Sequence, residues 1–317
     1  MELHPAFVPM ATLPSTGSVL DDLDASRAAF DAAWGPLAPG GEREVKLPNV
    51  RTDLRTITGP DGNDLLVRIY SPTDVDGLAP GLLLTHGGGF VLGNVDAEHT
   101  KAVRWCGQAG CVVASVDWRR APEHPFPAGI EDSYTALCWL VDHAGELAVD
   151  TERIGVAGSS SGGCFAAALA LMARDRRRPA LQFQCLIYPV LSDSCDSPSM
   201  LRDPAPPGWT QASAKATWAA YLGTGTTEVS PYASPSRATD LRGLPPAYIL
   251  TADYDVLRDE GIDYARRLME ADVPVHLHNF PGAIHGFEMM APHADISREA
   301  MQEQVEAVRR GLAAKVS

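Results

Sequence analysis

The chain has 317 residues, of which 45% are hydrophobic, and both values are ordinary for a globular protein with one large core. Asp and Glu outnumber Lys and Arg by 40 to 26, which gives a formal net charge of -14. A field of that sign repels polyanions, so nucleic acid is not expected as a partner. The six cysteines include no C-x-x-C pair, and neither a disulfide framework nor a zinc knuckle is predicted.

The sequence contains no membrane or export signal. No apolar run approaches the roughly 20 residues that span a bilayer. Residues 1–12 lack the basic and apolar segments of a signal peptide. These features predict a soluble, cytoplasmic protein with no membrane span.

The first 70 residues predict a helix followed by a hairpin. Residues 21–34 carry apolar residues near helical spacing behind an acidic start, and Gly35-Pro36 ends the helix. Two β-type stretches, 54–58 and 65–70, flank the turn-forming sequence Pro60-Asp61-Gly62-Asn63. The sheet is therefore expected to begin with this hairpin.

From residue 81 onward the chain alternates predicted strands and helices. The predicted strands are 81–85, 111–117, 153–158, 181–188, 246–251 and 275–280, and the predicted helices are 96–110, 130–143, 161–174, 257–271 and 295–314. Such alternation is typical of an α/β fold with a mostly parallel central sheet and helices on both faces. Residues 193–232 break it. They are rich in Pro, Ser, Gly and Thr with one helical segment near 213–222, and they predict an insertion that covers the mouth of the sheet.

The segment Gly158-Ser159-Ser160-Ser161-Gly162 runs from an apolar strand into a helix. Its Gly-x-Ser-x-Gly pattern is typical of a nucleophile elbow, in which glycines give room for a tight turn that exposes the Ser160 hydroxyl. The helix that follows favours negative charge at its N-terminus. Small-residue runs of this kind also occur for close packing alone.

A second glycine run, Gly87-Gly88-Gly89, follows the strand 81–85. Consecutive glycines at a strand end are entropically unfavourable unless backbone groups must approach something closely. We interpret the run as an oxyanion hole in preference to a flexible connection. His86 is expected to steady this loop through hydrogen bonds.

Two further residues follow later strands. Asp255 comes after the strand 246–251, and His285 comes after the strand 275–280. Catalytic groups of parallel sheets gather at the carboxyl ends of strands, where Ser160 is also predicted to lie. Asp253 and Asp259 are alternatives to Asp255 as the carboxylate.

No cofactor or metal ion is expected. His276 and His278 alternate on one strand and could form a metal pair. No third ligand follows at a suitable spacing, so a structural or exposed role is predicted for both.

Taken together, these motifs resemble the hormone-sensitive-lipase-like carboxylesterases (bacterial family IV) of the α/β-hydrolase fold. The matching segments, in the family's order, are His86-Gly87-Gly88-Gly89-Phe90, residues 118–128, 158–163 and 255–261, and His285-Gly286-Phe287. The resemblance covers residues 80–290 well and the first 50 residues poorly. The chain order Ser, Asp, His is also that of α/β-hydrolases.

The resemblance implies a role for each site residue. Ser160 would be the nucleophile, His285 the general base and acid, and Asp255 the carboxylate that orients the imidazole. Gly88, Gly89 and Ser161 would donate backbone N–H groups to the oxyanion. The elbow departs from the family's usual Gly-Asp-Ser-Ala-Gly-Gly at Ser159 and Ser161, and Val256 stands where the family usually has Pro.

The resemblance also implies a domain organisation. Residues 1–50 would form the N-terminal part of a helical cap and 193–232 the cap insertion, while residues 51–192 and 233–317 would form the α/β-hydrolase core. A homodimer paired through the strand 275–280 is a further expectation from the family.

The leading hypothesis is a serine carboxylesterase that hydrolyses short- to medium-chain esters through an acyl-enzyme on Ser160. One alternative is an amidase or arylacetamide-deacetylase-like hydrolase. Another is a non-catalytic small-molecule receptor of the same fold, against which the presence of His285 argues.

Overall fold

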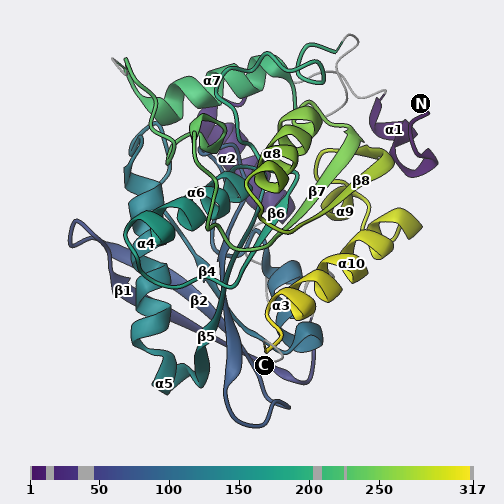
Figure 1. Ribbon diagram of the computed structural model, residues 1–317. Coiled ribbons are helices and arrows are strands. Elements are labelled where there is room, and N and C mark those ends of the chain that lie inside the picture. Colours follow the sequence, from purple (N-terminus) through teal and green to yellow (C-terminus); the bar gives the residue numbers. More distant parts are fainter. Residues whose placement is uncertain (1, 12–17, 35–45, 203–208, 225–226, 315–317) are drawn as a thin grey trace.

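The fold is built on one twisted sheet, seen in the computed structural model, which describes residues 2–11, 18–34, 46–202, 209–224 and 227–314 (Figure 1). Within these residues, eight strands pair in the order β1-β2-β4-β3-β5-β6-β7-β8. Strands β1, β2 and β4 pair antiparallel, and all pairs from β4 to β8 are parallel. This confirms the predicted mostly parallel sheet.

All the predicted strands are present. The strands are β1 (Val50–Thr58), β2 (Asp64–Pro72), β3 (Ala79–Thr85), β4 (Val112–Val116), β5 (Val149–Ser159), β6 (Phe183–Ile187), β7 (Ala247–Tyr254) and β8 (Val275–Ile284). Several extend beyond their predicted ends. Strand β8 continues through Pro281, where the sequence predicts a loop, because an edge strand tolerates a residue without an N–H. As a result, Asp255 and His285 are each the first residue after a strand.

The predicted helices are also present. They are α2 (Leu23–Trp34), α3 (His99–Ala109), α4 (Ala128–Asp142), α6 (Ser161–Asp175), α7 (Gln211–Leu222), α8 (Arg258–Glu270) and α10 (Asp295–Gly311). Shorter helices, which periodicity cannot predict, are η1 (Pro5–Phe7), α1 (Val8–Ala11), α5 (Ala144–Leu147), η2 (Pro235–Arg237) and α9 (Phe287–Met290). None of the helices in the described ranges combines the length and apolarity that crossing a bilayer requires.

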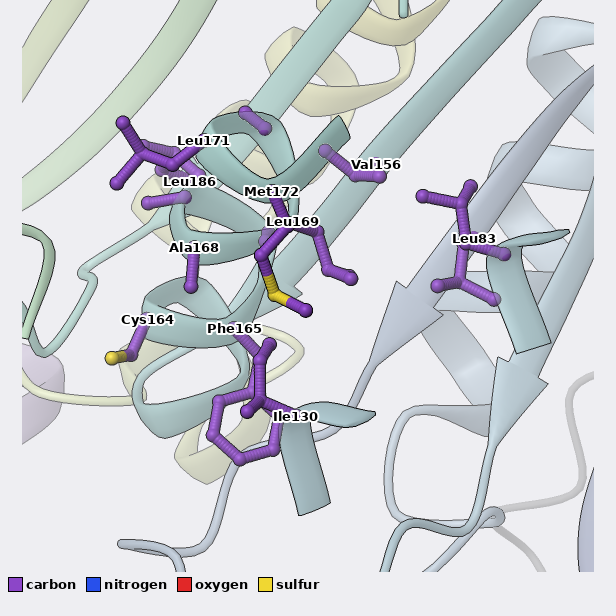
Figure 2. Packing of buried hydrophobic residues seen from close by; sticks show 14 of the residues in the cluster. Leu83, Ile130, Val156, Cys164, Phe165, Ala168, Leu169, Leu171, Met172 and Leu186 are labelled. Atoms are coloured by element: carbon purple, nitrogen blue, oxygen red, sulfur yellow. The ribbon is translucent and has the colours of Figure 1, made fainter. Parts of the chain in front are cut away.

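The core lies on both faces of the sheet because side chains alternate along each strand. In β3, Leu83 belongs to the core layer that α4, α6 and α8 cover, whereas Leu82 and Leu84 belong to the layer that α3 and α10 cover. Figure 2 shows the first of these layers, where Phe165 and Leu169 of α6 lie among side chains of the sheet and of α4. Helix α6 is buried almost along its whole length, so the turn before it is held by a rigid element.

Candidate active site

The turn between β5 and α6 has strained geometry. Ser160 joins the two elements at φ 57° and ψ -120°, a conformation that side-chain-bearing residues rarely adopt. Its N–H donates to Ile187 O at 2.9 Å. A Cβ on Gly158 would lie 2.2 Å from Gly162 O, and one on Gly162 would lie 2.0 Å from Thr85 O. Only glycine therefore fits at these two positions.

Three side chains form one hydrogen-bonded chain beside this turn. His285 Nε2 lies 3.0 Å from Ser160 Oγ, and His285 Nδ1 lies 2.7 Å from Asp255 Oδ2. Because a carboxylate only accepts, Nδ1 carries the proton and Nε2 is free to accept the serine hydroxyl proton. Asp255 is 2% exposed, and its Oδ1 accepts the Leu257 N–H at 3.0 Å. The arrangement can remove a proton from Ser160.

The two alternative carboxylates bind elsewhere. Asp253 accepts hydrogen bonds from the Asn279 side chain at 2.6 Å and from Gly282 N at 3.1 Å. It thereby joins β7 to the end of β8. Asp259 pairs with Arg258 and accepts the Ser199 N–H. Among the three candidates, Asp255 is the one that contacts His285.

The glycine run passes next to Ser160. A Cβ on Gly87 would lie 3.4 Å from Ser160 Cβ. Gly88 has φ 125°, and a Cβ there would lie 2.3 Å from Leu92 O, so the residue must be glycine. Gly89 has φ 59° and packs against the Trp209 ring. The amides of these two residues and of Ser161, the first residue of α6, thus come from two segments that meet at the elbow.

His86 at the start of this loop is fully buried. Its ring stacks on Trp118 with centroids 4.5 Å apart, and its Nδ1–H donates to Gly87 O at 2.8 Å. Burial lowers the pKa of His86 to about 3 because desolvation penalises the imidazolium. His86 is therefore a neutral support for the glycine loop at neutral pH.

Helix α7 packs on the residue that follows this loop, Phe90. Tyr221 of α7 stacks on Phe90 at 4.1 Å, and Trp218 lies 5.0 Å from the same ring. Both side chains are buried. In Figure 1, α7 lies beyond the end of the sheet at the top of the view. Arg27 of α2 donates to Val91 O at 3.0 Å.

Sequence reasoning missed a group of residues behind the elbow. Tyr188, the residue after β6, places its ring edge-on against His285 with centroids 4.7 Å apart. Lys101 of α3 donates to Ser159 Oγ and also faces Glu98 and Glu288. The position of Tyr188 at a strand end was an available signal. The buried Lys101 was not foreseeable, because a lysine in a helix is usually exposed.

Two histidines of β8, His276 and His278, contact the carboxylate of Glu303. His276 Nε2 and His278 Nδ1 lie 3.2 and 2.6 Å from the two oxygens of Glu303. Among the described residues, no group of His, Cys, Asp or Glu is arranged to hold a metal ion. All six cysteines are free.

Comparison with known proteins gives a consistent result. The profile of the α/β hydrolase fold family matches residues 82–289. The chain belongs to this family. A carboxylesterase of Mycobacterium tuberculosis, NlhH, is 38% identical over 306 residues, which cover 95% of this chain and 93% of that protein. An ethyl acetate hydrolase of Pseudomonas putida is 33% identical, with 94% of each chain covered.

Solved structures agree with the sequence relatives. A bacterial heroin esterase superposes with a TM-score of 0.92 at 38% identity, covering 98% of both chains. A thermostable esterase of Pseudomonas putida superposes with a TM-score of 0.87 at 31% identity, covering 98% of this chain and 97% of that one. The expected membership among the hormone-sensitive-lipase-like carboxylesterases is confirmed.

The buried His86 leads to a prediction about stability and pH. Its pKa is about 3 in the folded protein and near its ordinary 6.5 after unfolding, so the unfolded chain gains a proton below pH 6.5. The free energy of unfolding should fall from pH 6.5 to 4, with a contribution of up to about 1.4 kcal/mol per pH unit from His86. Urea denaturation of the wild type and of His86→Gln between pH 4 and 8 tests this. The variant should show the shallower slope, and parallel curves would contradict the prediction.

Proposed function

We propose that the protein is a serine carboxylesterase that hydrolyses short- to medium-chain carboxylic esters through an acyl-enzyme on Ser160. The observation that carries this proposal is the continuous chain Ser160–His285–Asp255, at 3.0 and 2.7 Å, beside the glycine loop. The names of the relatives support the reaction class, since they are a carboxylesterase and an ethyl acetate hydrolase.

In the first half of the reaction, Ser160 Oγ attacks the ester carbonyl carbon while its proton passes to His285 Nε2. Asp255 keeps the imidazole oriented and stabilises the imidazolium that forms. The carbonyl oxygen becomes an oxyanion that receives N–H groups from Gly88, Gly89 and Ser161. Collapse of this intermediate breaks the bond to the alcohol oxygen, and the alcohol leaves with the proton from His285.

In the second half, water replaces the alcohol. His285 takes a proton from the water as its oxygen attacks the acyl carbon, and a second oxyanion forms in the same position. Its collapse releases the carboxylic acid and returns the proton to Ser160. Each amide donor in such a site is worth about 3 kcal/mol of transition-state stabilisation, which explains the use of a glycine-rich loop.

The substrate pocket is proposed to lie between the core and a cap. The proposed cap comprises residues 1–50 and 193–232, and the contacts of Arg27 and of α7 with the glycine loop support this division. Trp209 belongs to the insertion and packs directly against Gly89. Its ring is thus placed to form a wall for the group bound beside the oxyanion.

The alternatives differ in measurable ways. A non-catalytic receptor of this fold would not react covalently with an organophosphate, whereas the hydrogen-bonded Ser160 and His285 favour reaction. An amidase would cleave an anilide as readily as an ester with the same acyl group. The homodimer through β8 and the cytoplasmic location stay predictions from the sequence.

The first of three predictions from the proposed function concerns the nucleophile. Ser160→Ala removes the attacking oxygen and should lower kcat/KM for p-nitrophenyl butyrate by about 10⁴- to 10⁶-fold, while the circular dichroism spectrum stays unchanged. In the wild type, an organophosphate should modify Ser160 alone, as located by peptide mass spectrometry. Modification of Ser159 or Ser161 instead, or full activity of the variant, would refute the assignment.

The second prediction separates the candidate carboxylates. Asp255→Asn presents an amide to His285 Nδ1 and disfavours the required tautomer, so kcat should fall by about 10⁴-fold. Asp259→Asn serves as the matched control because Asp259 binds Arg258 and Ser199 outside this chain of hydrogen bonds. Its kcat should stay near the wild-type value. Equal losses in the two variants would contradict the assignment of Asp255.

The third prediction concerns substrate size. Trp209→Ala should enlarge the pocket beside Gly89 and raise the octanoate-to-butyrate ratio of kcat/KM by about 10-fold or more, in line with the effect of a few methylenes in an apolar pocket. A panel of p-nitrophenyl esters measures this ratio. Leu201→Ala is the control, since Leu201 lies in the same insertion and is 58% exposed. An unchanged ratio in Trp209→Ala would exclude Trp209 as a wall of the pocket.

A further inference from the structure

A cluster of charged side chains is buried behind the elbow. Glu98, Lys101 and Glu288 are 4%, 3% and 5% exposed, although such residues are seldom buried. They come from the N-terminal end of α3 and from α9. None of them is among the residues to which the proposed mechanism gives a role.

One side of the cluster contacts the nucleophile's turn. The Lys101 ammonium donates to Ser159 Oγ and pairs with Glu98 Oε2 at 2.8 Å. Ser159 is the last residue of β5 and directly precedes Ser160. The ammonium is therefore held one residue away from the proposed nucleophile, on the side of the sheet covered by α3.

The other side of the cluster contacts the segment of the proposed base. Lys101 Nζ lies 3.5 Å from Glu288 Oε1, and the Tyr188 hydroxyl donates to the same oxygen at 2.8 Å. Glu288 follows His285 by three residues, and the Tyr188 ring lies edge-on against the His285 ring. The same lysine is thus connected to both Ser160 and His285.

The charge of Lys101 is maintained by its surroundings. Burial by itself lowers the pKa of Lys101, but attraction by Glu98 and Glu288 outweighs this effect and raises the pKa above its ordinary value. The buried ammonium has three well-defined partners, namely the carboxylates of Glu98 and Glu288 and the hydroxyl of Ser159. It can therefore fix the relative positions of the segments that carry them.

The topology explains why such a link matters. Ser160 follows β5 and His285 follows β8, and β6 and β7 separate these strands in the sheet. Direct strand pairing therefore does not set the 3.0 Å distance between Ser160 Oγ and His285 Nε2. A displacement of about 1 Å between reacting groups can lower a rate about 100-fold.

We propose that Lys101 is a positioning residue for ester hydrolysis, whose buried ammonium joins the turn carrying Ser160 to the segment carrying His285 through Ser159, Glu288 and Tyr188. The inference rests on the catalytic roles proposed above for Ser160 and His285. It also gives Ser159 a function. The Ser159 hydroxyl accepts a hydrogen bond from the Lys101 ammonium without adding a third carboxylate to the cluster.

Two variants and their combination test the proposal. Lys101→Met keeps an unbranched side chain, one atom shorter, and removes the charge. Ser159→Ala removes the acceptor and leaves the Lys101 carboxylate contacts in place, so its fold is expected to be retained. For each variant and the double variant, kcat and KM for p-nitrophenyl butyrate, the rate of inactivation by an organophosphate and the thermal midpoint are measured.

We expect kcat of Lys101→Met to fall by about 10- to 100-fold and that of Ser159→Ala by about 3- to 10-fold. KM should stay within about twofold of the wild-type value, because the cluster lies behind the elbow and contacts no substrate. The organophosphate rate should fall in parallel with kcat. The double variant should be no slower than Lys101→Met alone, because both changes remove the same link.

A matched control separates positioning from general destabilisation. Arg119→Met removes another cation that faces a fully buried carboxylate, since Arg119 pairs with Asp132 at 2.8 Å and with Asp61 on the surface. It should lower the thermal midpoint and leave kcat near the wild-type value. A loss of kcat in Arg119→Met equal to that in Lys101→Met would show that destabilisation alone explains the effect.

The proposal is overturned if Lys101→Met keeps kcat within about twofold of the wild type, or if the effects of Lys101→Met and Ser159→Ala multiply in the double variant. If Lys101→Met does not fold, the Ser159→Ala variant tests the proposal by itself. An unchanged kcat in Ser159→Ala would then overturn the proposed positioning role. The Ser160→Ala variant separates this outcome from failure of the proposed function. An active Ser160→Ala refutes the function, whereas an inactive Ser160→Ala with a fully active Lys101→Met refutes only the positioning role.

Discussion

The strained turn at Ser160 is the constraint on which the rest of the site depends. A residue with a side chain is held at φ 57°, a conformation that costs of the order of 1–3 kcal/mol. Hydrogen bonds on both sides hold it there, from Ser160 N to Ile187 O and from Val190 N to Ser160 O, at 2.9 and 3.0 Å. Glycines at positions 158 and 162 let the turn approach the end of β3. The buried helix α6 prevents the turn from relaxing.

The parallel sheet brings the other groups to this turn. Strands β3, β5, β7 and β8 all end at the same edge, so the residues that follow them converge although they are up to 200 positions apart in the chain. At each strand end, local hydrogen bonds decide which of several polar residues contacts the other groups of the site. Asp253 is still within β7 and holds Gly282, whereas Asp255 has left the strand and reaches His285.

Of two buried basic groups near the site, His86 is neutral and Lys101 is positively charged, and the difference has a physical reason. His86 has its nearest carboxylate oxygen, that of Asp117, 3.9 Å from Nε2, and burial lowers its pKa so that the ring stays neutral. Lys101 has the Glu98 carboxylate at 2.8 Å and stays charged. A neutral ring suits stacking on Trp118 beneath the glycine loop, and a charged ammonium suits a link between carboxylates and a hydroxyl. The same burial thus gives two kinds of support, according to the distance of the partner.

The sequence by itself determined the fold class, the alternation of strands and helices, and the chain positions at which chemistry was expected. These features depend on local patterns, namely hydrophobic periodicity, glycines at a strand-to-helix turn, and polar residues at strand ends. Only the tertiary structure decided that Asp255 rather than Asp253 or Asp259 contacts His285, because one or two residues of strand length change the direction of a side chain. It also decided the burial of Lys101 and its contact with Ser159, which are 58 residues apart. No local pattern encodes such a contact, since it exists only once α3 has packed against the end of β5.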